Sequence, residues 1–385
     1  MTDFQTQSAR LTAWCKDYAL PLWGTKGVDP SGGFWESIGM DASPDHDALR
    51  RVRVQARQCY VFAHAAHMGW YDKAEDVANH GWNYLTTKGL QGGEDIAGGD
   101  FAGCAHLLNP DSTLHDGWRD TYAQAFLILA SSWRYRAFDN SSAKAMLFDT
   151  LNFLNTHVKA ENEGWREGIP APTPRRQNPH MHLFEAFLAA YEATSDQTFM
   201  DLADHIFGMF TDYFFEPKTQ TLLEFFEQDW SPDAKTGDLT EPGHAMEWAW
   251  LIHWYARLSG HDVTDYAEKL YHAGVKMGTN PKTGLLINEC KIDGEITKGE
   301  SRLWPQTEYI KANVARARAG HADAYDNAAQ MIDKMFHYYL ETPVKGGWHD
   351  QRDADGVITS HNMSSSTFYH IFCCAAEAQY LANMS

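Results

Sequence analysis

The stretch EPGHAMEWAW, residues 241–250, is the starting point for interpreting this chain. Pro242 and Gly243 do not fit a helix interior, whereas the residues after them carry apolar side chains at helical spacing as far as Leu258. A buried helix is therefore expected to open at His244. Glu247 follows three residues later, so its carboxylate shares a helix face with the imidazole, one turn deeper. A histidine oriented in this way is suited to proton transfer, although a capping residue above a core helix would show the same pattern.

Glycine-containing and aromatic loop segments recur along the chain at nearly constant distances. Measured from Gly33, Gly99, Gly164, Thr221, Thr283 and Gly346, the intervals are 66, 65, 57, 62 and 63 residues. An apolar helical stretch follows each segment, starting near Arg53, Tyr122, His182, His244, Trp304 and Thr367. A more amphipathic stretch precedes each segment, at residues 8–22, 73–86, 142–157, 197–215, 264–277 and 322–340. The period predicts twelve helices in six hairpins.

The two ends of the repeat array indicate that it closes on itself. A linear array needs polar terminal repeats, but residues 372–376 in the last helix are as apolar as the middle helices. We therefore predict an all-α (α/α)6 barrel with an inner ring of six parallel helices, six outer helices, and short strands in the loops at its mouth. Residues 1–385 contain no linker or low-complexity tract, so a single catalytic domain is expected.

Composition narrows the class of ligand and the location. The net charge of -19, from 51 acidic and 32 basic residues, argues against nucleic acid or an anionic membrane as a partner. A neutral small molecule fits better, and 14 tryptophans are compatible with stacking on sugar rings. The six cysteines show no spacing of a zinc site or disulfide framework, so reduced thiols are expected. No signal peptide or apolar span is evident, which predicts a cytoplasmic protein.

Polar side chains recur with the period of the fold where the inner helices begin. They are Arg57, Tyr122, His182, His244, Glu308 and His370, at intervals of 65, 60, 62, 64 and 62 residues. Parallel inner helices would bring them together at one rim, and unpaired buried polar groups cost about 1–3 kcal/mol each. We therefore expect a functional site there. Helix N-termini carry partial positive charge, which predicts neutral histidines able to accept a proton.

Other candidates have competing interpretations. His182 is the inward choice from residues 178–182, and His180 is interpreted as a surface or capping residue. His182 with Glu185, and His244 with Glu247, both spell HxxE, so a divalent metal site is an alternative to a metal-free site. Trp35 and Trp304 are the aromatics expected to stack on a sugar, and Arg57 requires Glu308 or a ligand hydroxyl as partner. Histidines outside the period are interpreted as structural or exposed: His64, His67, His106, His115 and His253.

These motifs together resemble the N-acylglucosamine 2-epimerase family over essentially the whole chain. They are Arg57-Gln58, Asn178-x-x-x-His182, the PGHxxEW sequence at 242–248, the WPQTE sequence at 304–308, and Tyr369-His370. Within the family, the chain looks most like the mannose isomerase branch, aldose-ketose isomerases that act on D-mannose and related free aldoses.

The resemblance implies an (α/α)6 barrel, no cofactor, and proton transfer by histidine. It implies His244 and His370 as the catalytic pair, with the sugar held or supported by Arg57, Tyr122, Asn178, His182 and Glu247. Sulfosugar-handling relatives carry an additional arginine ahead of the PGH motif, whereas residues 231–238 here contain none. Together with the negative net charge, this difference disfavours an anionic sugar.

We hypothesise an enediol mechanism in which His370 moves a proton between C2 and C1. His244, held by Glu247, would serve ring opening and the oxygens, while Arg57 and His182 would stabilise the enediolate. The histidine roles could be exchanged. The same residues would serve sugar 2-epimerisation, which is the main alternative. Less favoured are a glycoside hydrolase using Glu247 and Glu308, and a non-catalytic sugar-binding protein. The preferred aldose and the oligomeric state stay open at this stage.

Overall fold

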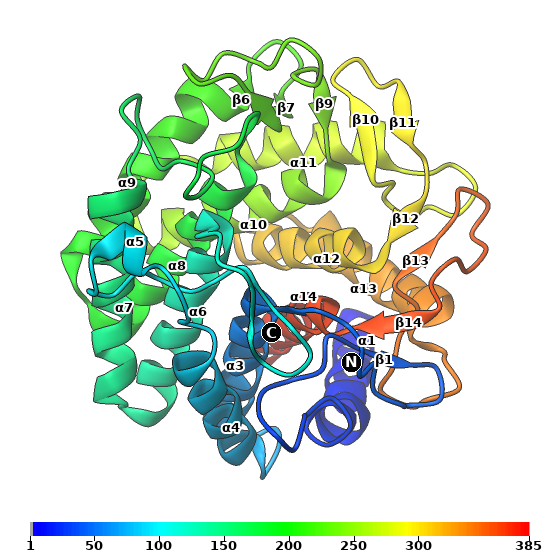
Figure 1. Ribbon diagram of the computed structural model, residues 1–385. Coiled ribbons are helices and arrows are strands. Elements are labelled where there is room, and N and C mark those ends of the chain that lie inside the picture. Colours follow the sequence, from blue (N-terminus) through cyan, green and yellow to red (C-terminus); the bar gives the residue numbers. More distant parts are fainter. Residues whose placement is uncertain (1–2, 385) are drawn as a thin grey trace.

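Helices of the inner layer form a closed ring (Figure 1). The computed structural model describes residues 3–384, and within that range each inner helix packs against the next, with the last packing against the first. The ring consists of α3 (Val52–His67), α6 (Thr121–Phe138), α8 (Asn178–Thr194), α10 (Pro242–Ser259), α12 (Leu303–Arg318) and α14 (Ser365–Met384). Their first turns face one end of the barrel, as the period predicted.

The outer layer surrounds this ring. Its helices are α1 (Asp3–Trp14), α4 (Ala74–Thr87), α7 (Ser141–Phe153), α9 (Gln197–Met209), α11 (Thr264–Gly278) and α13 (Asp323–Met335). Several end in a π-helical turn, namely η1 (Cys15–Ala19), η2 (Leu154–Val158), η3 (Phe210–Phe214) and η4 (Phe336–Leu340). Short helices α2 (Leu20–Trp23) and α5 (Glu94–Ala97) lie in the connections. The (α/α)6 barrel predicted from the sequence is confirmed.

The pairing of the helices differs from the expected order by one step. Each outer helix packs on the inner helix that precedes it in the chain, so that α4 packs on α3 and α13 on α12. The outer helix α1 has no preceding partner and packs instead between α13 and α14. Short turns join inner to outer helices, whereas long loops lead to the next inner helix. The sixth hairpin is consequently made from the two ends of the chain.

Burial explains the two layers. The inner helix α10 is buried on nearly every side, whereas α13 buries Ala324, Ala328, Ile332 and Met335, which lie on one face at helical spacing. Among the described residues, buried apolar side chains of both layers form one continuous cluster. The six cysteines are buried free thiols, as expected. No helix in the described range is long and apolar enough to cross a membrane.

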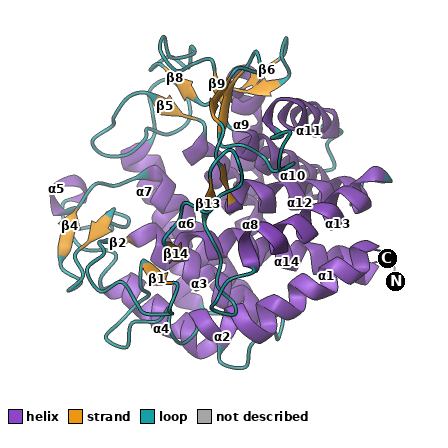
Figure 2. Cartoon of the chain, turned by 90° about the vertical axis from the view of Figure 1, so that its right-hand side faces the viewer, coloured by secondary structure: helices purple, strands orange, loops and turns teal. Residues whose placement is uncertain are grey.

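Short antiparallel strands link neighbouring loops around the mouth. Figure 2 shows most of them on the side of the molecule away from the chain ends. The first and last loops are joined by β1 (Ser37–Gly39) and β14 (Asn362–Ser364). The others are β2 (Arg50–Arg51) with β3 (Leu107–Leu108) and β4 (Leu114–Asp116), β5 (Arg175–Arg176) with β8 (Phe225–Phe226), β6 (Phe215–Glu216) with β7 (Thr221–Leu222), β9 (Leu239–Thr240) with β10 (Glu289–Lys291) and β11 (Ile296–Lys298), and β12 (Ser301–Arg302) with β13 (Gln351–Arg352).

A repeated contact holds several loops to the inner helices. The side-chain oxygen of Gln124 accepts from the backbone N–H of Cys104 at 2.8 Å, and its nitrogen donates to the Cys104 carbonyl at 3.0 Å. Gln55 and Gln306 make the same pair of contacts in other repeats. In the third repeat, His180 accepts from the N–H of Trp165 at 3.1 Å and is fully buried. The interpretation of His180 as a surface residue is therefore wrong, because it satisfies a loop amide.

Candidate active site

A cavity of about 420 Å³ opens where the inner helices begin. All six inner helices contribute to its lining, because parallel helices present their first turns at the same level. Most of the periodic residues do line it, together with Asn178, Glu247 and Trp304. The lining residues expected from the sequence are Arg57, Tyr122, Asn178, His182, His244, Glu247, Trp304 and His370.

His244 lies in the first turn of α10, which begins at Pro242, two residues before the expected start at His244, because proline is tolerated in the first turn of a helix. Its Nδ1 is 3.0 Å from Oε2 of Glu224, and its Nε2 is 2.8 Å from the amide nitrogen of Asn178. We expected Glu247 to orient this ring, and that expectation is wrong. Glu247 lies one turn deeper on α10, where its carboxylate faces His182 at 4.0 Å.

The charge state of His244 also differs from the prediction. Burial lowers the pKa of His244, but the carboxylates of Glu224 and Glu241 outweigh burial and raise the pKa to about 9. Glu241 Oε2 lies 3.9 Å from Nδ1. The partial charge of the helix N-terminus is smaller than the charge of two nearby carboxylates. The raised pKa favours a cationic His244 near neutral pH, whereas the sequence predicted a neutral ring. A proton on Nε2 needs the unpartnered side-chain oxygen of Asn178, in place of its nitrogen, to face the ring.

His370, in the first turns of α14, has the opposite charge state. Its Nδ1 donates to Oε1 of Glu308 at 2.8 Å. Burial lowers the pKa of His370 well below its ordinary value, and the nearby positive charges of Arg57 and Lys311 lower it further. The ring is therefore neutral, with its proton on Nδ1 and an unprotonated Nε2. That nitrogen is the accepting atom of a general base.

Glu308 does not line the cavity, so the expectation that it binds substrate is wrong. It is fully buried behind His370, and its second oxygen lies 2.7 Å from Nζ of Lys311. Nearby carboxylates help to raise the pKa of Lys311 above its usual value, so this side chain stays charged inside the barrel. Glu308 thus positions a histidine and pairs with a lysine.

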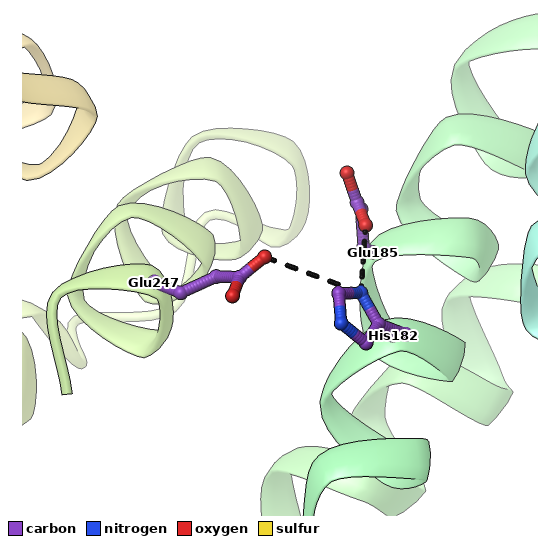
Figure 3. Close-up of side chains that lie close together, drawn as sticks. All are labelled: His182, Glu185 and Glu247. Atoms are coloured by element: carbon purple, nitrogen blue, oxygen red, sulfur yellow. Dashed lines mark hydrogen bonds and ion pairs between the residues drawn. The ribbon is translucent and has the colours of Figure 1, made fainter. Parts of the chain in front are cut away.

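His182 lies on α8 between two carboxylates (Figure 3). Its Nδ1 is 3.2 Å from Oε2 of Glu185 on the same helix and 4.0 Å from Oε1 of Glu247 on α10. Burial lowers the pKa of His182 to about 4, although Glu185 favours the charged form. Glu185 also accepts a hydrogen bond from the hydroxyl of Tyr369, and its own pKa is lowered in spite of burial. His182 is therefore neutral, with its proton directed at Glu185.

Two groups of three side chains have the spacing of metal ligands. The first is the cluster in Figure 3, and the second shares Glu247 with it. In each group the ligand atoms lie within 4.8 Å of one another. Lys311 already places a positive charge against the carboxylates of the second group, and burial raises the pKa of Glu247 well above its ordinary value. The members are His182, Glu185 and Glu247, and Glu247, Glu308 and His370.

Arg57 reaches the cavity from α3. Its guanidinium donates to the hydroxyls of Tyr122 and Ser366 and lies 4.2 Å from the ring centre of Phe126. We expected Glu308 or a ligand as its partner, but the hydroxyls occupy this position in the described structure. Because neither hydroxyl is an anion, the arginine keeps an uncompensated positive charge beside the cavity.

The two tryptophans expected to stack on a sugar have different locations. Trp304 lines the cavity, and its ring centre lies 5.1 Å from that of His244 and 5.6 Å from that of His370. Trp35 is buried outside the lining, with its ring against His46 and Arg50. The expectation for Trp35 is wrong, because its indole packs against these side chains and is not part of the cavity lining.

The upper wall contains charged residues that the sequence analysis missed. His106, interpreted as structural or exposed, lines the cavity with Trp118, and its Nδ1 lies 3.4 Å from Asp120. The sequence did contain a signal for these charged wall residues, because the residue directly before an inner helix is often charged. Each rim arginine has a carboxylate partner: Arg51 with Glu36, Arg53 with Asp120 at 3.7 Å, Arg176 with Glu167 at 2.7 Å, and Arg302 with Glu241 at 3.7 Å.

The fold and this cavity define an (α/α)6 barrel whose mouth is lined by histidine, carboxylate and arginine side chains. The model of the N-acylglucosamine 2-epimerase family matches residues 33–374. The chain belongs to this family, as its motifs suggested, and it is an isomerase.

Relatives with different names match the chain over most of its length. The chain is similar to a mannose-6-phosphate isomerase of Rhizobium meliloti, with 35% identity over 98% of each chain. It is 22% identical to a cellobiose 2-epimerase of Ruminococcus albus over 87% of this chain and 88% of the relative. A solved structure of a D-mannose isomerase superimposes with a TM-score of 0.85 at 21% identity, covering 99% of this chain and 98% of that one.

Proposed function

We propose that this protein interconverts D-mannose and D-fructose through an enediol. The observation that supports this function best is the pair of histidines on either side of Trp304 with opposite charge states. Isomerisation needs a base for a carbon-bound proton and an acid for an oxygen, and two sites with separated pKa values supply both. Relatives named mannose isomerases support the same substrate.

The proton transfers follow from these charge states. Nε2 of neutral His370 takes the proton from C2 of the open aldose, while cationic His244 donates its Nε2 proton to O1, which forms the enediol. His244 then takes the proton of O2, and His370 returns its proton to C1, which forms the ketose and restores both histidines. Arg57 stabilises the negative charge that develops on the oxygens. His182 keeps its proton on Nδ1 towards Glu185, so it accepts from a sugar hydroxyl and does not stabilise an anion.

The direct test is a product assay with D-mannose in deuterated buffer. We expect fructose as the first product, with partial deuterium at C1 and no glucose at early times. The proposal needs no cofactor and no metal, so a chelator should leave the initial rate unchanged. Inhibition by the chelator would assign the carboxylate cluster of Figure 3 to a metal instead.

Epimerisation at C2 is the second candidate, because a cationic histidine and a neutral one are also what inversion requires. His244 would then return a proton to the face of C2 opposite to His370. Relatives named cellobiose 2-epimerases support this alternative. Glucose formed from mannose before fructose, with deuterium at C2, would favour the epimerase and contradict the isomerase.

The charges around the cavity support a neutral sugar. The rim arginines are already paired with carboxylates, so an added phosphate would face charges that are largely compensated. We expect kcat/KM to be higher for mannose than for mannose 6-phosphate, although one relative is named for the phosphorylated sugar. The reverse order would show that the rim binds phosphate.

The geometry gives little support to a glycoside hydrolase. Inverting hydrolysis needs two carboxylates about 6.5–9.5 Å apart, with room between them for water. The nearest oxygens of Glu247 and Glu308 lie within 4.8 Å of each other, and Glu308 does not line the cavity. A binding protein without activity would not need two histidines in opposite charge states.

A further inference from the structure

Glu224 is a buried carboxylate of the fourth loop that the mechanism above does not use. It follows β7 and is 2% exposed. Its Oε2 accepts from the amide nitrogen of Gln177 at 2.8 Å and lies 3.0 Å from Nδ1 of His244. Its Oε1 accepts from the backbone N–H of Glu241 at 3.2 Å. One side chain therefore connects the starts of α8 and α10.

The hydrogen-bond pattern determines the protonation of this carboxylate. The side-chain oxygen of Gln177 accepts from the indole N–H of Trp248 at 2.7 Å, and an indole N–H can only donate. The amide nitrogen of Gln177 must therefore face Glu224. Both oxygens of Glu224 then face groups that donate, which is the hydrogen-bond pattern of an ionised carboxylate. Because Glu224 is an acceptor only, Nδ1 of His244 must be the protonated partner.

The other nitrogen of His244 depends on the same carboxylate. Nε2 lies 2.8 Å from the side-chain nitrogen of Asn178, the residue next to Gln177. A protonated Nε2 requires this amide to turn its oxygen, which has no partner in the described structure, towards the ring. Gln177 is held to Glu224 twice, because its backbone N–H also donates to the Glu224 carbonyl at 3.2 Å. Glu224 thus contacts one ring nitrogen directly and, through Gln177, places the residue that contacts the other.

We propose that Glu224 is the positioning residue that keeps His244 an imidazolium with its transferable proton on Nε2. The inference rests on the isomerase function proposed above and explains how one of its two histidines becomes the acid. Glu224 would act only through His244, since it does not line the cavity.

Other titratable groups near His244 are less well placed for this role. Glu241 lies 3.9 Å from Nδ1 and is shared with Arg302 at 3.7 Å. Glu247, one turn deeper, and His182, on α8, interact with His244 through charge alone in the described structure. Glu224 is the carboxylate within hydrogen-bonding distance of Nδ1, so removing its charge should shift the pKa of His244 most.

The experiment compares Glu224→Gln and Glu224→Asp with Glu227→Gln, which alters an exposed carboxylate of the same loop. Two quantities are measured: the pH profile of kcat/KM for mannose, and the titration of the His244 ring by nitrogen-15 NMR, assigned with His244→Asn. We expect Glu224→Gln to lower kcat about 10- to 100-fold with little change in KM. The His244 pKa should fall towards or below its ordinary value, so that activity declines from neutral pH upwards.

Glu224→Asp keeps the negative charge and should restore part of the activity and of the high His244 pKa, even if Glu224→Gln proves too unstable to purify. Glu227→Gln should match the unaltered protein in both measurements. An unchanged His244 titration in Glu224→Gln, with equal loss of rate at every pH, would overturn the proposal and indicate a structural role. A His244 pKa at its ordinary value in Glu224→Asp, where the negative charge is still present, would overturn it as well. The NMR titration does not require turnover. If Glu224→Gln shifts the His244 pKa although the unaltered protein does not convert mannose to fructose, the isomerase function alone is refuted.

Discussion

At the scale of single residues, two histidines of similar sequence context have opposite charge states. His244 and His370 both lie in the first turns of inner helices and both contact a carboxylate through Nδ1. The two carboxylates differ in whether a cation other than the histidine lies next to them. Glu308 is paired with Lys311, whereas Glu224 contacts uncharged donors besides His244. A carboxylate without a competing cation raises the pKa of its histidine more strongly.

Replacing His370 with Asn tests the assignment of the base. Asn has no nitrogen that can accept a proton, so exchange of the C2 proton of mannose with solvent deuterium should fall at least about 100-fold. Binding of mannose, measured by quenching of tryptophan fluorescence, should change much less. Exchange that persists at a comparable rate would assign the carbon-bound proton to His244.

The pH dependence of kcat/KM follows from the two pKa shifts. His244 has a pKa raised to about 9, so its cationic form is complete well below pH 9 and is lost above it. His370 has a lowered pKa and is neutral throughout that range. We expect a plateau through neutral pH and a decline of about tenfold per pH unit above pH 9. A rate that still rises between pH 6 and 8 would contradict the neutral state of His370.

At the scale of elements, buried glutamines connect the loops of the mouth to the inner helices. The site depends on these contacts, because the loops supply Glu224 and most of the rim residues while the helices supply the histidines. Gln55 and Gln306 were not identified from the sequence, because a glutamine side chain in a helix can face a loop, a ligand or solvent. Only the path of the loops decided that the backbones of Phe34 and Leu286 are the partners.

Gln124→Ala measures the strength of one such contact. The change leaves the buried N–H and carbonyl of Cys104 without partners, and unsatisfied groups cost about 1–3 kcal/mol each, so we expect the free energy of unfolding to fall by roughly 2–6 kcal/mol. Urea unfolding followed by tryptophan fluorescence gives the value. The exposed Gln197→Ala is the control, with a change within about 0.5 kcal/mol. Equal stability of the two variants would show that Cys104 finds other partners.

At the scale of the whole molecule, the chain ends complete the barrel. The outer helix α1 packs against α13 and α14, and β1 pairs with β14, so the first repeat covers the last one. This closure explains why the final helix can be as apolar as the middle helices. It also completes the ring at the mouth, because the last inner helix, which carries His370, packs beside the first.

Leu11→Ala tests this closure, because Leu11 is a fully buried residue of α1. The loss of a core leucine should lower the free energy of unfolding by about 2–5 kcal/mol. If α1 belongs to the same cooperative unit as the site, activity and tryptophan fluorescence should be lost at one urea concentration. Ala13→Gln, on the exposed face of α1, is the control, because glutamine is also a good helix former. Fluorescence changes that precede loss of activity would show that α1 detaches separately.

The sequence by itself determined the repeat, the barrel, and the level at which polar side chains meet, because hydrophobic periodicity is local and the interval between repeats is regular. Its motifs also identified the family. Only the tertiary structure decided which carboxylate contacts which histidine. Glu224 lies 20 residues before His244, so that contact depends on how its loop folds onto α10, and Glu308 lies 62 residues before His370, so that contact depends on how α12 packs beside α14. A pKa reflects burial and every nearby charge, including those from other helices, which is why the helix-terminus argument predicted the wrong charge for His244.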